Sequence, residues 1–123
     1  MLLTATIEKL HEETAVVTFS SPLTLGSGLQ MADAQVQAAI ANGVTRMVFD
    51  LSSVDYADSA GLGMLVYVCG ILGQKNGTIR LCGVGPRVAS LLKLTKTDAL
   101  FAIDDCRKDS VAALLDSLPS AEA

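Results

Sequence analysis

Hydrophobic and polar residues follow two different periods along the chain, and the change from one period to the other predicts its elements. Segments in which apolar residues alternate with polar ones, or form a short β-branched run, indicate strands. Segments with apolar residues three or four positions apart indicate helices. The expected strands are 3–8, 15–19, 46–51, 78–82 and 100–103, and the expected helices are 29–41, 59–76, 86–94 and a last one after residue 105.

The order of these elements predicts an α/β fold. Its sheet is expected to be mixed and mostly parallel, with about five strands, and to be accompanied by about four α-helices. The first two strands are joined by the turn 11–14 and are expected to form an opening β-hairpin. We expect one domain over residues 1–118 and a frayed C-terminal tail over 119–123. Asp104 or Asp105 is expected to cap the last helix. Four apolar residues of that helix are then expected to face inward: Val111, Leu114, Leu115 and Leu118.

Composition narrows the class of protein. The 123 residues are 50% hydrophobic and 18% charged, with a net charge of -4. The chain therefore lacks the excess positive charge with which proteins bind nucleic acid or an anionic membrane. The cysteines, Cys69, Cys82 and Cys106, lack the spacing of a zinc site or a disulfide framework. We therefore expect a cytoplasmic protein that needs no metal or cofactor, does not insert into a membrane, and is a monomer or weak dimer.

The segment from Asp50 to Gly63 joins a buried strand to a helix and carries the most informative chemistry. Ser59 falls at the helix start, where free N–H groups and the helix dipole favour an anion. Gly61 and Gly63 are expected to leave the first turn thinly covered, so that another protein can approach the backbone. A simpler interpretation is that Asp58 or Ser59 only caps the helix.

The segment 44–103 resembles a STAS domain of the anti-sigma-factor antagonist type. The likeness lies in the motif D-S-A-G-L-G after a strand that ends V-F-D-L, and in the later run L-L-K-L-T-K-T-D-A-L-F-A-I. The resemblance implies that Ser59 is phosphorylated by a serine kinase that is also the anti-sigma factor. It further implies that the unphosphorylated form binds this partner and frees a sigma factor, and that a PP2C-type phosphatase resets the switch.

The chain departs from the family pattern at two places. Ser21-Pro22-Leu23-Thr24 stands where the family commonly has a glycine and an acid, and the resemblance places that acid close to the phosphorylated serine. Ala60 stands where many members have a second hydroxyl residue, so Ser59 is the one acceptor in the motif.

The predicted partner surface combines the start of helix 59–76 with the neighbouring loop. This helix is apolar nearly all round, and the stripe of Leu65, Val68, Cys69 and Leu72 is expected to face the sheet. The remaining apolar residues either pack against a neighbouring helix or form the partner surface. The residues assigned to that surface are Asp58, Ser59, Ala60, Gly61, Leu62, Gly63, Met64, Tyr67, Ser21 and Thr24.

Two other kinds of function remain open. One is a constitutive STAS scaffold, such as a partner of a lipid-transport ATPase or of a stress-signalling assembly, in which Ser59 is never modified. The other is an enzyme, either a phospho-aspartate receiver or a serine hydrolase. A receiver needs an acidic pair after its first strand and a lysine after its last. A hydrolase would need His11, the sole histidine, beside Ser59. Both patterns are lacking, so we expect no catalytic residues.

Overall fold

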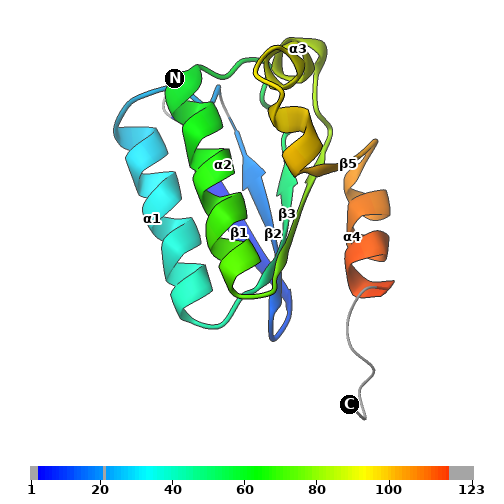
Figure 1. The fold of residues 1–123 in the computed structure, drawn as a ribbon. Helices are drawn as coiled ribbons and strands as arrows, with labels where there is room; N and C mark the ends of the chain where they lie inside the picture. The colour runs from blue at the N-terminus through cyan, green and yellow to red at the C-terminus, as the bar shows by residue number, and fades with distance from the viewer. Residues whose placement is uncertain (1–2, 21, 117–123) are drawn as a thin grey trace.

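The computed structural model describes residues 3–20 and 22–116 and shows a five-stranded sheet with helices on both faces (Figure 1). Along the sheet the strands follow their order in the chain, with β1 antiparallel to β2 and the other neighbours parallel. The strands are β1 (Ala5–His11), β2 (Thr14–Phe19), β3 (Arg46–Asp50), β4 (Thr78–Cys82) and β5 (Ala102–Asp104). The helices are α1 (Ser27–Ala41), α2 (Ser59–Gln74), α3 (Pro86–Leu94) and α4 (Arg107–Asp116), with a short 3-10 helix η1 (Thr97–Leu100).

The helices divide between the two faces of the sheet because of this simple strand order. Each parallel crossover advances by one strand in the same direction, and right-handed crossovers then place their helices on one face. Figure 1 shows α1 and α2 side by side across that face and α4, which follows the last strand, on the opposite side. The predicted α/β class, with an opening hairpin and a mostly parallel sheet, is confirmed.

The core is split by the sheet into a large and a small cluster. Beneath α1 and α2, fully buried residues of β2, β3 and β4 pack together, and the rings of Phe19 and Phe49 meet edge to face at 5.4 Å. On the opposite face the next residues along the strands contact α4, because side chains alternate across a strand. That small cluster comprises Val16, Val48, Cys82 and Leu114, with Val111 packed against it.

Two expected strand boundaries are wrong. His11 is the last residue of β1 rather than part of the turn, because it pairs with Thr14 and leaves only two residues to connect the strands. The last strand was expected from residue 100, but η1 occupies 97–100 and β5 covers Ala102–Asp104. A short apolar run such as 100–103 does not distinguish a strand from a helical turn by its pattern alone.

The expected capping of the last helix is also wrong. Helix α4 begins at Arg107, and the Asp104 carboxylate instead pairs with Arg80 at 2.8 Å and accepts a hydrogen bond from the Ser110 hydroxyl. Leu114 is buried as expected, whereas Leu115 is 41% exposed, so the inward face is narrower than expected. Leu118 and the tail 119–123 lie outside the described residues.

Candidate functional site

Asp58 links the start of α2 to the loop that follows β2. Its Oδ1 accepts a hydrogen bond from the backbone N–H of Gly61 at 3.0 Å, which makes Asp58 the N-cap. Its Oδ2 accepts another from the N–H of Leu25 at 2.9 Å. The hydrogen bonds from Leu25 and Gly61 lower the pKa of Asp58 below its ordinary value, so the residue is a carboxylate at neutral pH. The simpler interpretation of a capping residue therefore holds for Asp58.

Ser59 is the first residue of α2 and is exposed. Since Asp58 provides the cap, the Ser59 hydroxyl is not needed for it, and within the described part of the chain this hydroxyl has no hydrogen-bond partner. The dipole at the start of a helix favours a negative charge at this position. The hydroxyl is therefore exposed at a position where a negative charge is favoured.

The loop after β2 lies directly against the start of α2. Leu23 is fully buried and forms a parallel bridge with Ala57, and its carbonyl accepts the N–H of Asp58 at 3.1 Å. A Cβ added to Gly61 would lie 2.0 Å from the Leu23 carbonyl oxygen, so only glycine permits this approach. The expectation that Gly61 is thinly covered is wrong, whereas a Cβ on Gly63 would meet nothing within 4 Å.

The residues assigned to the partner surface differ in their exposure. Ala60 is partly exposed, Gly63 is exposed, and Tyr67 is 61% exposed. In contrast Leu62 and Met64 are buried, at 9% and 7%, so they support the surface more than they contribute to it. Thr24 is partly exposed in the loop beside Asp58, and Ser21 lies outside the described residues.

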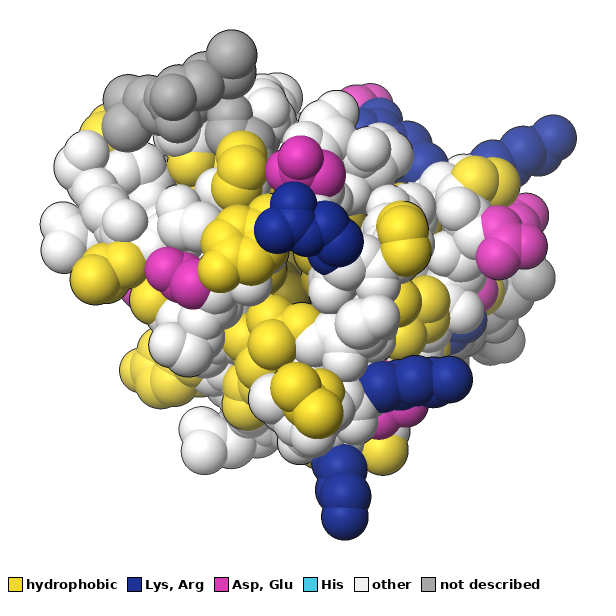
Figure 2. Space-filling view, turned by 90° about the horizontal axis from the view of Figure 1, so that it is seen from above, with side chains coloured by type: hydrophobic (Ala, Val, Ile, Leu, Met, Phe, Trp, Pro, Cys, Tyr) yellow, Lys and Arg dark blue, Asp and Glu magenta, His cyan; other side chains and the backbone are white. Residues whose placement is uncertain are grey.

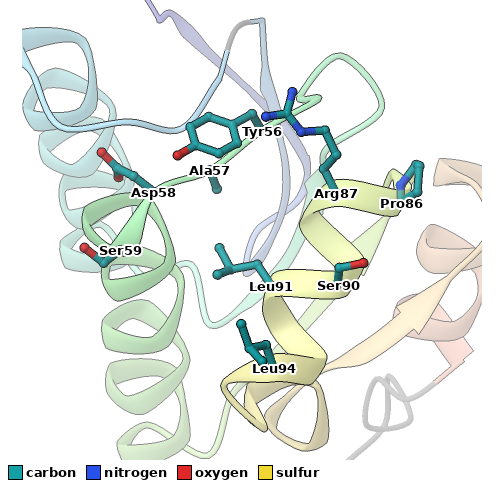
Figure 3. A pocket seen from close by; sticks show the side chains of 9 residues that line it. All are labelled: Tyr56, Ala57, Asp58, Ser59, Pro86, Arg87, Ser90, Leu91 and Leu94. Atoms are coloured by element: carbon teal, nitrogen blue, oxygen red, sulfur yellow. The ribbon is translucent and has the colours of Figure 1, made fainter.

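A groove of about 570 Å³ separates the start of α2 from α3 (Figure 3). Figure 2 looks onto this end of the molecule and shows apolar side chains gathered at its centre. The Arg87 guanidinium lies 4.7 Å from the centre of the Tyr56 ring on one side of the groove. The lining residues are Tyr56, Ala57, Asp58, Ser59, Pro86, Arg87, Ser90, Leu91 and Leu94.

Sequence reasoning missed the α3 side of this groove. It predicted the helix 86–94 but assigned no function to it. A signal was present, because α3 places Val88 and Leu92 in the core while Leu91 and Leu94 fall on another face. The nine-residue helix thus carries apolar side chains on two faces, and Leu94 on the second face is 82% exposed.

A smaller hollow of about 270 Å³ lies on the other side of the α2 start, between α1 and α2. Asp33 is the charged residue in its lining, and Tyr67 forms its exposed wall. The first turn of α2 is thus a ridge with a hollow on each side. The residues around the second hollow are Leu29, Gln30, Asp33, Ala60, Met64 and Tyr67.

Asp50, at the end of β3, connects the loop leading to Ser59 with α4. Its carboxylate accepts hydrogen bonds from the N–H and hydroxyl of Ser52 at 3.0 and 2.7 Å, and from Arg107 Nε at 3.1 Å. Burial acts to raise the pKa of Asp50, but the hydrogen bonds from Ser52 and Arg107 together lower it. Arg107 also donates to the Thr18 hydroxyl and lies 3.6 Å from the Glu8 carboxylate. Sequence reasoning did not find this network.

Over residues 3–20 and 22–116, no three His, Cys, Asp or Glu side chains form a group that could hold a metal ion. None of the helices in that part of the chain is both long and apolar enough to cross a bilayer.

Comparison with known proteins shows the family to which the chain belongs. The fold and the accessible serine define a small α/β module in which a strand, a loop and a helix present one hydroxyl group. The model of the STAS domain family matches residues 6–112. BtrV of Bordetella bronchiseptica, whose name describes it provisionally as an anti-sigma factor antagonist, is 31% identical over 87 residues, which are 71% of this chain and 75% of BtrV. The chain belongs to the STAS domain family.

Solved structures show the same fold at low sequence identity. A Thermotoga maritima protein is similar with a TM-score of 0.82 and 18% identity, covering 90% of this chain and 94% of that one. The anti-sigma factor antagonist SpoIIAA in its unphosphorylated form has a TM-score of 0.73 and 16% identity, covering 94% and 100%. Bacillus SpoIIAA in its phosphorylated form also has a TM-score of 0.73, at 15% identity, covering 89% and 98%.

Proposed function

We propose that this protein is an anti-sigma factor antagonist whose binding is switched by phosphorylation of Ser59. In the unphosphorylated form it binds an anti-sigma factor that is also a serine kinase, and a sigma factor is thereby freed. A PP2C-type phosphatase restores the unphosphorylated form. The protein acts in the cytoplasm by binding and performs no catalysis of its own. The observation that carries the proposal is the exposed Ser59 hydroxyl. This hydroxyl is not used for capping, because Asp58 is the N-cap of α2.

The physics of the switch follows from the position of Ser59. A phosphate adds about -1.5 to -2 charges and three acceptor oxygens to the surface that a partner must cover. Asp58 is already a carboxylate next to it, so the partner would have to desolvate two adjacent negative groups. The helix start tolerates the added charge, so binding is lost while the fold is kept.

Two findings on relatives support the proposal. BtrV is named for the same role and is similar over most of its length. SpoIIAA, which shares the fold, has been solved in both phosphorylated and unphosphorylated forms. These observations concern those proteins, and they identify the modification to look for here.

The first experiment is phosphopeptide mapping of the protein isolated from its host in growing and in stressed cells. Trypsin should release residues 47–75, which also contain Ser52 and Ser53, so fragmentation must assign the phosphate to one serine. We expect phosphate on Ser59 with an occupancy that changes between conditions. Absence of phosphate in every condition would contradict the switch and favour a constitutive scaffold.

A binding comparison tests the consequence of the modification. Ser59→Asp should weaken binding to the kinase partner at least tenfold in calorimetry, whereas Ser59→Ala should keep it. Ser53→Asp, an exposed serine in the preceding loop, is the charge-matched control and should bind like the wild type. Equal affinity of the two Ser59 variants would contradict the proposal, and all variants should melt at nearly the same temperature.

A further inference from the structure

Helix α3 places a cation, Arg87, on its side of the groove, and the Asp58 carboxylate lies on the α2 side. The net charge of the protein is -4, yet residues 86–97 contain Arg87, Lys93 and Lys96 and no acid. Arg80 and Arg107 are held by carboxylates, whereas among the described residues Arg87 has no carboxylate within ion-pair distance and rests on the Tyr56 ring. Figure 2 shows both cationic and acidic side chains around the apolar centre of this face.

Two apolar side chains of the groove, Leu94 and Tyr56, lie outside the core, whereas Ala57 is part of it and Leu91 packs against it. Leu94 is 82% exposed and Tyr56 is 40% exposed, while Leu91 is partly exposed in the wall between them. The core-facing residues of the same helix, Val88 and Leu92, are each 1% exposed. The second apolar face of α3 is therefore available to a partner, and Arg87 borders it in the groove.

We propose that the groove between α2 and α3 docks an acidic segment of the anti-sigma factor, with an apolar side chain of that segment against Leu94 and Tyr56. A carboxylate of the segment pairs with Arg87. The inference rests on the proposed function for the identity of the partner, and it adds the chemistry by which the partner is recognised.

Charge complementarity selects this occupant over a second copy of the chain. A symmetric dimer through this face would bring α3 against α3, so that Arg87, Lys93 and their copies would share one interface. Like charges across an interface are costly. A carboxylate-bearing segment instead meets a cation that has no ionic partner within the described residues, beside an apolar surface.

The same geometry explains why a phosphate on Ser59 would act against this occupant. Ser59 and Arg87 border one groove (Figure 3). A phosphate on Ser59 would add negative charge to the lining of the groove and repel the carboxylates of the docked segment. Phosphorylation would therefore weaken the binding of an acidic segment more than the binding of a neutral one.

The test is site-specific photo-crosslinking in the host. Leu94 is replaced by p-benzoylphenylalanine in one variant, Gly63 in a second, and Lys75, at the far end of α2, in a third. Mass spectrometry identifies the crosslinked peptide. We expect the Leu94 position to crosslink to a segment rich in Asp or Glu in the kinase, the Gly63 position to crosslink to the same protein, and the Lys75 position to give no such product.

Arg87→Glu, added to the Leu94 crosslinker, should reduce the yield at least tenfold. Lys75→Glu, an equal change of charge outside the groove, should leave the yield unchanged. Both residues are exposed, so the thermal midpoint should stay at the wild-type value in each variant.

The outcomes separate this inference from the proposed function. Crosslinks to the kinase from the Gly63 position but not from Leu94 would overturn the docking site and leave the proposed function standing. A crosslink from Leu94 to an acidic segment of a protein that is not a kinase would support the groove and contradict the proposed partner. A basic segment, a second copy of this chain, or a yield indifferent to Arg87→Glu would overturn the inference.

Discussion

The face of the sheet beneath α1 and α2 is closed by apolar contacts over most of its width, whereas α4 covers the other face with a small apolar cluster bordered by charges. On the first face, fully buried side chains from three strands meet those of two long helices. On the second, Leu114 meets Val16, Val48 and Cys82, and the polar anchors are Arg107 on Asp50 and Ser110 on Asp104.

The difference between the two faces predicts which contacts stabilise the fold at any pH and which depend on the charge of a carboxylate. Apolar burial does not depend on protonation, so the α1 and α2 face should be insensitive to pH. The attachment of α4 depends on Asp50, whose carboxylate also binds the backbone and hydroxyl of Ser52 in the loop that leads to Ser59. A change in the charge of Asp50 therefore acts on α4 and on the site loop together.

The largest expected effect comes from matched core truncations on the two faces. Leu65 and Leu114 are both fully buried, in α2 and α4 respectively. Leu65→Ala should lower the free energy of unfolding by about 3–5 kcal/mol, because the large cluster cannot collapse around the cavity. Leu114→Ala should cost about 2 kcal/mol, since α4 can shift to fill the space. Urea denaturation measures both, and a greater loss for Leu114→Ala would contradict the comparison.

An intermediate effect is expected at the two glycines of the α2 start. Gly61→Ala should destabilise the protein by about 1–3 kcal/mol, because the new Cβ would force the Leu23 backbone away. Gly63→Ala is the control, and with open space around it a gain of up to about 1 kcal/mol is expected from helix propensity. Thermal unfolding compares them, and equal shifts would show that the loop after β2 does not pack as described.

The smallest effect concerns the charges beneath α4. Arg107→Met removes a hydrogen bond to Asp50, and because the Arg107 side chain is 42% exposed the cost at pH 7 should be only about 1 kcal/mol. Asp50 has a pKa below its ordinary value of 3.8, so its stabilising contribution is complete above that value and is lost as pH falls through the lowered pKa.

The advantage of the wild type over Arg107→Met should therefore shrink below about pH 4. Free energies of unfolding measured from pH 7 down to the acid limit of folding would show this. Lys108→Met, on the next and exposed residue of α4, is the control and should show no such trend. A difference that stays constant with pH would mean that Arg107 contributes only through its packing and its hydrogen bond to the Thr18 hydroxyl.

Most of the fold followed from periodicity. The strand 78–82 and the helix 86–94 were predicted with the bounds that the structure shows, because Gly77 and Gly83 flank the strand and Pro86 begins the helix. Errors arose where a short segment had no such marker. The run 100–103 was divided between η1 and β5, and Asp104 was assigned to a cap although its partner, Arg80, lies 24 positions earlier.

The start of α2 was predicted from the sequence, and the resemblance pointed to Ser59. The burial of Gly61 under Leu23 and the groove beside α3 were not predicted, because both depend on segments that are distant in the chain. A pattern along one segment reports which residues are apolar or charged, and it carries no information on which other segment covers them.

By itself the sequence determined the order and kind of the elements, the family motif around Ser59 and the acidic balance of the chain, because all three are local or additive properties. Only the tertiary structure decided that Asp58 holds two segments with one carboxylate, that Arg87 is left without an ionic partner among the described residues, and that Asp50 joins α4 to the site loop. These are pairings between distant residues. Their geometry is set by the packing of helices on the sheet, which no single segment specifies.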